Sequence, residues 1–313
     1  MSRLSAGLVR ITMLLVLGFT QPALGAGAPS RGTLYLSALG GTLYRASYVY
    51  DGDAVFTVSR PTAVALLRRG GSVRVLPDGR VVVVGAGYVS VYDPRRHTVA
   101  LVNSLTNANT ATLDPSGAKL WVGWKDTALS EVPLSPLANG TPHAVGGDDT
   151  VATMLAFAPG QGAFYTTGGE FENGNFGRIN LATFSTTRVA ASAYATGVVY
   201  EPYSQTLITA GLGRARQMAP SSPATVLSTR DDSVAGENYL VLEPTGQGHV
   251  IGTRSGGEAR VVLIDFSAGG RIGDTATTLH SAVLGTITDL SGGAGWDGDL
   301  VFDDAFEPPA LSP

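Results

Sequence analysis

The residues of this chain best suited to chemistry are carboxylates on glycine-rich stretches. Glu170 and Glu172 stand two positions apart, and Asp126 closes the run Trp124-Lys125-Asp126. Carboxylates at positions i and i+2 on an irregular loop can converge on a hard cation or serve as a general base. A solvated loop rich in glycine and asparagine explains the glutamates equally well, so the sequence leaves both interpretations open.

Other kinds of chemistry are limited by what the sequence lacks. No two of its four histidines are spaced i, i+2 or i, i+4, so a histidine metal site would need residues from distant parts of the chain. The absence of cysteine excludes disulfides, thiolate catalysis and cysteine metal sites. There is no Gly-x-Ser-x-Gly elbow, phosphate loop or dinucleotide fingerprint. The sequence therefore identifies no cofactor and no metal site, and the carboxylates leave a divalent cation as the open option.

These candidates lie between regularly repeated turns, which predict how they are positioned. Intervals of 38, 44, 43 and 42 residues separate five prolines, Pro77, Pro115, Pro159, Pro202 and Pro244. A strand-like apolar run precedes each proline, and a glycine follows it eight or nine residues later. Proline presets φ for the first turn corner, and a glycine two residues on accepts the left-handed corner. A period near forty with strand-like content is typical of a β-propeller, with one four-stranded blade per repeat.

Aligning the repeats on their prolines brings small polar residues to equivalent positions. Six positions before the second to fifth prolines stand Asn109, Thr153, Thr196 and Asn238. Apolar residues stand two and four positions before each proline, and strand alternation places all three positions on one side. We expect a ring of amides and hydroxyls at the mouth of the axial channel, where it binds a small polar ligand or holds water. The pairs Asp148-Asp149 and Asp231-Asp232 precede inner strands and could join this ring or form turns.

The two ends of the chain determine the number of blades. Residues 33–59 contain three strand-like runs with no leading strand, whereas residues 283–290 resemble a leading strand with no blade after it. Pairing the two ends gives a composite blade that closes the ring. We predict an all-β propeller of six four-stranded blades, with seven as the alternative because residues 301–302 could add strand content.

The pattern resembles a known superfamily. The Pro-x-Gly turns, the β-run and glycine after them, and Val89-Ser-Val-Tyr-Asp93 are similar to the blades of YVTN-type and WD40-like bacterial propellers over roughly residues 33–290. Lactonase-like and streptogramin-lyase-like propellers belong to this superfamily. The resemblance implies the fold, and in the lyase-like members a histidine and a glutamate act as acid and base. The nearest counterparts here are His280 and Glu237.

The N-terminus predicts export. Arg3 and Arg10 form a positive region, Ile11–Phe19 is apolar but short for a membrane span, and Ala23-Leu24-Gly25 supplies small residues for cleavage. The ending Phe302-Asp-Asp-Ala-Phe-Glu307 also resembles Phe-x-Asp-Gly-Phe-Glu endings of some exported proteobacterial proteins. We predict a signal peptide over 1–25, a linker over 26–32, a propeller over 33–302 and a flexible tail over 303–313. The protein is expected in the periplasm or outside the cell, without a membrane span after cleavage.

Composition and loops together define the expected function. The net charge of −4 and the absence of a polybasic run exclude a nucleic-acid partner. The leading hypothesis is an exported scaffold that binds a small molecule or a protein. The alternative is a lactonase-like hydrolase or lyase with a carboxylate-lined, divalent-metal site at the channel mouth, formed by Asp126, Glu170, Glu172 and His280. A structural surface protein that self-associates is a third hypothesis.

Overall fold

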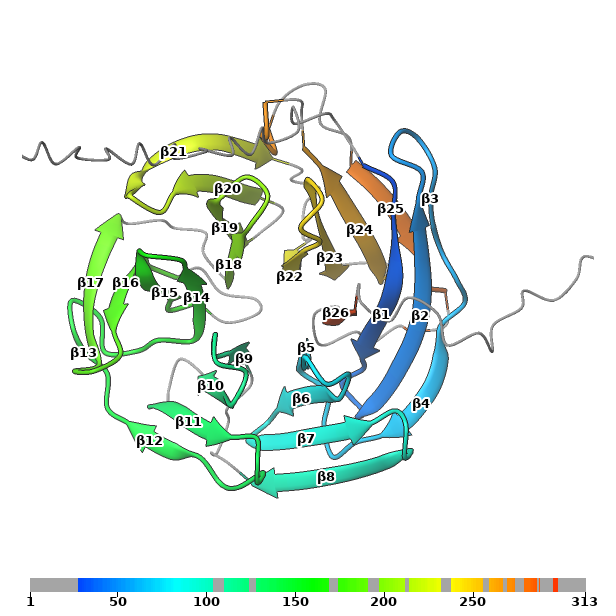
Figure 1. The fold of residues 1–313 in the computed structure, drawn as a ribbon, viewed down its shortest axis with the longest axis horizontal. Helices are drawn as coiled ribbons and strands as arrows, with labels where there is room; N and C mark the ends of the chain where they lie inside the picture. The colour runs from blue at the N-terminus through cyan, green and yellow to red at the C-terminus, as the bar shows by residue number, and fades with distance from the viewer. Residues whose placement is uncertain are drawn as a thin grey trace, which may run out of the picture.

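The strands in the described part of this chain form six mainly antiparallel sheets, arranged as blades around one axis (Figure 1). The computed structural model describes residues 28–103, 110–123, 128–168, 174–190, 197–211, 214–231, 238–255, 259–266, 269–273, 279–285, 287 and 295–297. These residues contain no helix, and so no helix among them is long and apolar enough to cross a membrane. The prediction of a six-bladed all-β propeller is confirmed.

We number the blades in chain order, from the closing blade that joins the two ends of the chain. The closing blade contains β26 (Gly295–Asp297), β1 (Ser30–Ser37), β2 (Thr42–Tyr50), β3 (Phe56–Val58) and β4 (Thr62–Leu66). The second blade contains β5 (Ser72–Val75), β6 (Val81–Gly85), β7 (Tyr88–Asp93) and β8 (Thr98–Asn103). The third blade contains β9 (Thr110–Leu113), β10 (Lys119–Gly123), β11 (Leu129–Pro133) and β12 (Thr141–His143).

The remaining three blades follow the same order from the axis outward. The fourth contains β14 (Met154–Ala158), β15 (Gly162–Thr166), β16 (Phe176–Asn180) and β17 (Ser185–Ala190), with β13 (Gly146–Gly147) added in parallel to β17. The fifth contains β18 (Gly197–Glu201), β19 (Thr206–Gly211), β20 (Arg214–Ala219) and β21 (Ser222–Asp231). The sixth contains β22 (Asn238–Pro244), β23 (His249–Ser255), β24 (Arg260–Asp265) and β25 (Leu279–Val283).

The turn chemistry of the repeats is as predicted. In three repeats the glycine two residues after the proline has a positive φ: 83° at Gly79, 70° at Gly117 and 72° at Gly246. A residue with a Cβ is disfavoured in this left-handed conformation, so glycine allows the chain to reverse directly from the first strand of the blade into the second. In the fifth blade Gln205 takes the left-handed position with a φ of 55°.

The strand that closes the ring differs from the predicted one. Residues 283–290 were expected to lead into the composite blade, but Val283 ends β25, the outer strand of the sixth blade. The closing strand is β26, which pairs with β1 from Thr33↔Asp297 to Tyr35↔Gly295. Inner and outer strands can carry the same apolar pattern, so the pattern of residues 283–290 could not show which kind of strand they form. In addition β1 begins at Ser30, so residues 30–32 of the expected linker pair with β2.

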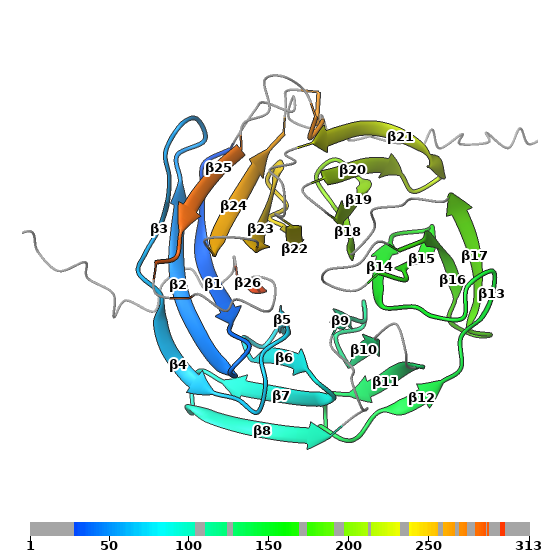
Figure 2. The same ribbon diagram turned by 180° about the vertical axis from the view of Figure 1, so that it is seen from behind.

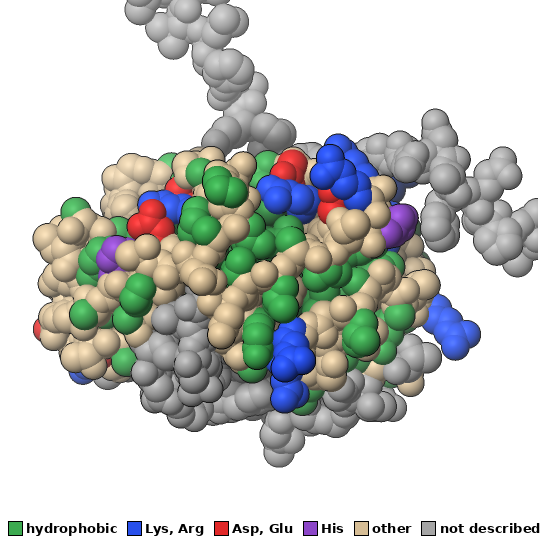
Figure 3. Space-filling view, turned by 90° about the horizontal axis from the view of Figure 1, so that it is seen from below, with side chains coloured by type: hydrophobic (Ala, Val, Ile, Leu, Met, Phe, Trp, Pro, Cys, Tyr) green, Lys and Arg blue, Asp and Glu red, His purple; other side chains and the backbone are tan. Residues whose placement is uncertain are grey.

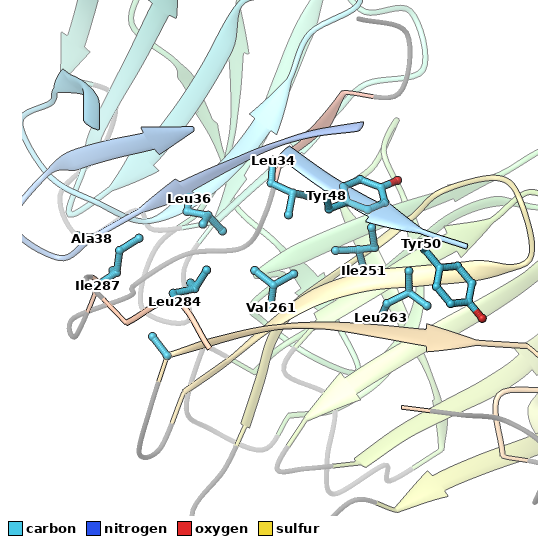
Figure 4. Close-up of a cluster of buried hydrophobic side chains, with 11 residues drawn as sticks. Leu34, Leu36, Ala38, Tyr48, Tyr50, Ile251, Val261, Leu263, Leu284 and Ile287 are labelled. Carbon is cyan, nitrogen blue, oxygen red and sulfur yellow. The ribbon is translucent and has the colours of Figure 1, made fainter. Parts of the chain in front are cut away.

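The core consists of six clusters, each of which packs between two neighbouring blades. Figure 4 shows the one between the closing and sixth blades, where Leu34 and Tyr48 lie near Ile251 and Val261. Four-stranded blades cannot bury both faces alone, so each blade depends on its two neighbours for burial. The expected sidedness of the inner strands is also present: Leu155, two positions after Thr153, packs toward the third blade.

Candidate functional site

The inner strands of the six blades surround the axis, and Figures 1 and 2 show them from the two ends of the ring. They are β26, β5, β9, β14, β18 and β22. Among the described strands, none pairs with the inner edge of these six, so the N–H and C=O groups of that edge need other partners. These partners decide which part of the channel is available for a ligand.

Side chains of one blade bond the free edge of the next. The Ser37 hydroxyl donates to the Gly71 carbonyl at 2.6 Å and accepts from the Gly71 N–H at 3.0 Å. The Thr112 hydroxyl does the same for Leu155, with both distances 3.0 Å. The Thr110 hydroxyl donates to the Thr153 carbonyl. At these two interfaces the edge groups are used for structure, so they are not free to recognise a ligand.

Arg74 and Glu243 form a different kind of contact. Arg74 on β5 and Glu243 on β22 belong to the second and sixth blades, which flank the closing blade, so their ion pair joins the inner strands on either side of β26. The Arg74 Nη1 also donates to the Val73 carbonyl at 2.8 Å. The side chains are 10% and 19% exposed, so the pair is largely buried but retains some exposure to solvent.

Glu243 differs from the carboxylates at equivalent positions. Asp114 and Glu201 also stand directly before the turn proline, and each bonds its own turn: Asp114 accepts from the Ser116 N–H at 2.9 Å, and Glu201 accepts from the Ser204 N–H at 2.6 Å. The Glu243 turn is held instead by Thr245, whose hydroxyl donates to the His249 carbonyl at 2.9 Å. The Glu243 carboxylate is thereby left for Arg74.

The environment of Glu243 favours its neutral form. Burial raises the pKa of this carboxyl above its ordinary value, and the attraction and hydrogen bond of Arg74 oppose that rise without cancelling it. A carboxyl poised in this way can take up a proton more readily than an exposed glutamate. The pair therefore combines a permanent cation with a group whose charge can change.

Of the four residues of the predicted polar ring, Thr153 is described with its side chain and Asn238 through its backbone alone. Thr153 is buried at 1% exposure; its N–H donates to the Thr166 carbonyl at 2.7 Å, and its hydroxyl has no hydrogen-bond partner within the described chain. Asn238 begins β22, where its backbone pairs with Ser255. Asn109 and Thr196 lie outside the described residues, so a ring at the channel mouth stays a prediction.

The loop carboxylates behind the enzymatic alternative, Asp126, Glu170 and Glu172, also lie outside the described residues. Among the residues that are described, no group of three or more histidine and acidic side chains is placed to hold a metal ion. A divalent site at the loops, and with it the hydrolase or lyase hypothesis, stays a prediction.

Asp149 lies on the outer side of the fourth blade, away from the predicted ring. Its carboxylate accepts from the Tyr165 hydroxyl, from the Asn175 Nδ2 at 2.7 Å and from the Arg188 Nη2 at 2.5 Å. Burial alone would raise the pKa of Asp149, but the hydrogen bonds from Arg188, Tyr165 and Asn175 outweigh burial and hold the pKa below its ordinary value. The residue fixes the β13 segment onto β17. Asp231 likewise pairs with Arg214, at 2.5 Å.

Two histidines are part of the packing between blades. His249 is buried beside the Tyr50 ring, at 5.5 Å between centroids, and burial lowers its pKa despite a hydrogen bond to the Ala28 carbonyl. His143 stacks on Phe184 at 4.1 Å and lies 3.5 Å from Glu131. Each contact joins neighbouring blades or elements, and these residues show no arrangement of nucleophile and base.

A surface depression of about 440 Å³ lies on the fourth blade, near Arg178. The guanidinium of Arg178 donates to the carbonyls of Gln161 and Pro220, at 2.7 and 2.6 Å, and lies 4.6 Å from the centre of the Phe164 ring. Its charge is thus engaged in joining the fourth and fifth blades. The Arg74–Glu243 pair is the stronger candidate site.

Sequence reasoning missed the Arg74–Glu243 pair. Arg74 interrupts the apolar run Ser72-Val-Arg-Val75 three positions before its proline, where the other repeats have Thr112, Ala156, Val199 and Val241. A single cation on an otherwise apolar inner strand was the signal that could have identified it. Its partner is 169 positions away, and no local pattern connects the two.

Comparison with known proteins supports the fold and leaves the family open. Neither the models of protein families nor the curated proteins contain a match. Among solved structures, a chain of the mitotic checkpoint complex is 15% identical, with 88% of each chain covered and a TM-score of 0.50. The extracellular domain assigned to the hybrid two-component system BT4673 of B. thetaiotaomicron is 13% identical, with a TM-score of 0.50. The match covers 80% of this chain and 33% of that one, so this chain spans about a third of its length. These similarities concern the fold alone, and the six sheets around one axis define the class of the protein, a six-bladed β-propeller.

Proposed function

We propose that this chain is an exported binding propeller whose channel recognises a small anionic ligand through Arg74. The observation that carries the proposal is the Arg74–Glu243 pair, which places a largely buried cation beside a carboxyl of raised pKa. The equivalent carboxylates, Asp114 and Glu201, hold their own turns. Glu243 differs in bonding Arg74 and not its own turn, and under this proposal that difference serves ligand recognition.

The guanidinium of Arg74 has capacity for a ligand. It carries five N–H donors in a fork that matches a carboxylate or phosphate, and the described contacts of the side chain all use Nη1. An anion that approaches Nε and Nη2 would compete with Glu243 for the charge. Because burial has raised the pKa of Glu243, that carboxyl can accept a proton as the ligand enters, which removes the repulsion between two anions.

Two further points support the placement of this protein in the cell and in a superfamily. The N-terminal 25 residues have the pattern of a cleaved leader, and one structural neighbour is an extracellular domain, which supports a periplasmic or secreted location. The repeated Pro-x-Gly turns and six blades support membership of the YVTN-type or WD40-like superfamily.

The proposal is tested by calorimetric titration with succinate and with inorganic phosphate. We expect one anion to bind per chain, more tightly at about pH 5 than at about pH 8, with net proton uptake. Arg74→Gln should abolish the binding. Arg80→Gln, which removes a more exposed arginine paired with Asp78 on the same blade, should leave it unchanged. Failure of both anions to bind at millimolar concentration, or binding that survives Arg74→Gln, overturns the proposal.

A further inference from the structure

The outer strand of the second blade, β8, is an unprotected sheet edge. No strand of the described chain pairs with its outer side. Five of its six residues are exposed, including Val99 at 43% and Leu101 at 49%. Its pairing with β7 is regular from Tyr88↔Asn103 to Asp93↔Thr98, without a bulge. The edge therefore offers a straight row of backbone donors and acceptors.

The other outer strands carry features that discourage pairing with a further strand. β12 has three residues and contains Pro142, and β17 is covered in part by β13. β21 has two register shifts and contains Pro223, and β4 is irregular next to Tyr44. β25 lies against β3 of the closing blade. Proline, bulges, short length and covering are the usual means of blocking strand addition, and β8 has none of them.

The charges around β8 indicate an acidic partner. Four exposed arginines stand at the two ends of this blade, although the chain as a whole is acidic, with 25 Asp and Glu against 21 Lys and Arg. Arg95 and Arg96 are exposed in the turn that enters β8, and Arg68 and Arg69 are exposed at the opposite end of the blade, where Arg68 lies over the Tyr88 ring. Seen from the side on which β8 lies, apolar side chains gather in the middle, with basic side chains above and below them and acidic side chains among the upper ones (Figure 3).

One stretch of this chain has the matching pattern. Residues 299–307 read Asp-Leu-Val-Phe-Asp-Asp-Ala-Phe-Glu, in which a β-prone apolar run lies between carboxylates. We propose that β8 is a docking edge that takes up the 299–307 stretch of a second copy of this chain as an added strand. Backbone hydrogen bonds supply the contact, Leu300–Phe302 cover Val99 and Leu101, and the carboxylates meet the arginines at both ends of the blade.

The proposed register needs a second copy, because Leu300, the first residue of the apolar run, cannot reach β8 within its own chain. β26 ends at Asp297 beside β5, and β8 lies three strand spacings outward from β5, which is about 14 Å. Leu300 is three residues past Asp297, and three residues span at most about 10 Å. Contact between an edge of one copy and the tail of the next is heterologous, so it builds rings or open chains of copies.

The experiment is sedimentation velocity on the full chain across a concentration series, at low and at high salt. We expect the mean mass to grow with concentration and to fall at high salt, because the arginine–carboxylate contacts are screened. Leu101→Lys on β8 and Phe302→Asp in the partner stretch should each return the protein to a monomer. Val226→Lys on β21 is the matched control, since Val226 is 47% exposed on an outer strand, and it should associate as the parent does. A synthetic 299–307 peptide should bind the parent chain, compete with the 299–307 stretch of the second copy and shift the protein to the monomer.

Several results would overturn this proposal. These are a monomer at every concentration, association that survives either Leu101→Lys or Phe302→Asp, or an equal loss in Val226→Lys. Phe302→Asp changes none of the described strands, so it keeps the test decisive if a β8 variant misfolds. Binding of phosphatidylserine vesicles without binding of the peptide would instead assign this face to an anionic membrane surface.

Discussion

Replacing Arg74 by methionine removes the partner of a buried carboxylate at the axis of the ring. Methionine keeps most of the aliphatic length and removes the guanidinium, so Glu243 loses both the opposite charge and the hydrogen bond. Breaking a buried pair by removing one partner typically costs about 3–5 kcal/mol. With side chains 10% and 19% exposed, we expect the Arg74→Met chain to lose about that much unfolding free energy at about pH 8.

Protonation of Glu243 limits the loss of unfolding free energy in Arg74→Met, so the size of that loss depends on pH. Protonating a carboxyl with an ordinary pKa of 4.5 costs about 1.4 kcal/mol per pH unit above that value, hence about 5 kcal/mol at about pH 8 and about 1 kcal/mol at about pH 5. The pKa of Glu243 is higher in the folded chain than in the unfolded chain. Its protonation therefore contributes fully to the free energy of unfolding below the unfolded-state pKa, and this contribution is lost as pH rises through the folded-state pKa. Removal of Arg74 raises the folded-state pKa of Glu243 further, so the pH range over which stability changes extends to higher pH.

The assay is urea denaturation of the parent, Arg74→Met, Glu243→Gln and the double variant at both pH values. We expect Arg74→Met to lose about 3–5 kcal/mol at about pH 8 and about 1–2 kcal/mol at about pH 5. The double variant should recover most of the loss at the higher pH, because glutamine has no charge to leave unpaired. Equal losses at the two pH values, or no recovery in the double variant, would refute the account of Glu243 as a buried and titratable carboxyl.

Two further predictions concern the fourth blade and the loops. The folded-state pKa of Asp149 is lowered, since hydrogen bonds from Arg188, Tyr165 and Asn175 outweigh its burial, so its stabilisation is present above its ordinary pKa and lost as pH falls through the folded value. Asp149→Asn should therefore cost about 1–3 kcal/mol at neutral pH and weaken the acid dependence of urea unfolding, and an unchanged acid slope would contradict this. For the loops, a binding propeller should show no tightly held divalent ion in metal analysis and no change in melting temperature on chelation. One ion per chain, with melting lowered by chelator, would favour the hydrolase or lyase hypothesis.

Local turn chemistry explains why so much of the fold could be predicted. The left-handed corners at Gly79, Gly117 and Gly246 depend on residues two positions apart, so they are present in the sequence as printed. Strand alternation correctly identified Val73 and Leu155 as packed positions of their inner strands, and the structure shows that each packs against the preceding blade. These features require no knowledge of distant contacts.

The candidate site could not be predicted in the same way. The repeat placed Thr153 at the start of an inner strand, but it could not show that Thr153 is 1% exposed or that its carbonyl accepts from Thr110 of the third blade. Asp149 precedes an inner strand in the sequence, yet the β13 segment carries it to the outer strand of its blade. Sequence position sets the order of the strands, whereas the packing of neighbouring blades sets which side chains face the axis.

The sequence alone determined the repeat, its turns and the face that each inner strand packs inward, because these arise from interactions over a few residues. The tertiary structure alone decided which short strand closes the ring and which charges meet there. β26 pairs with β1 across nearly the whole chain, and Arg74 finds Glu243 169 positions away. Such contacts form only when six blades complete a circle, and closure is a property of the ring that none of the individual repeats contains.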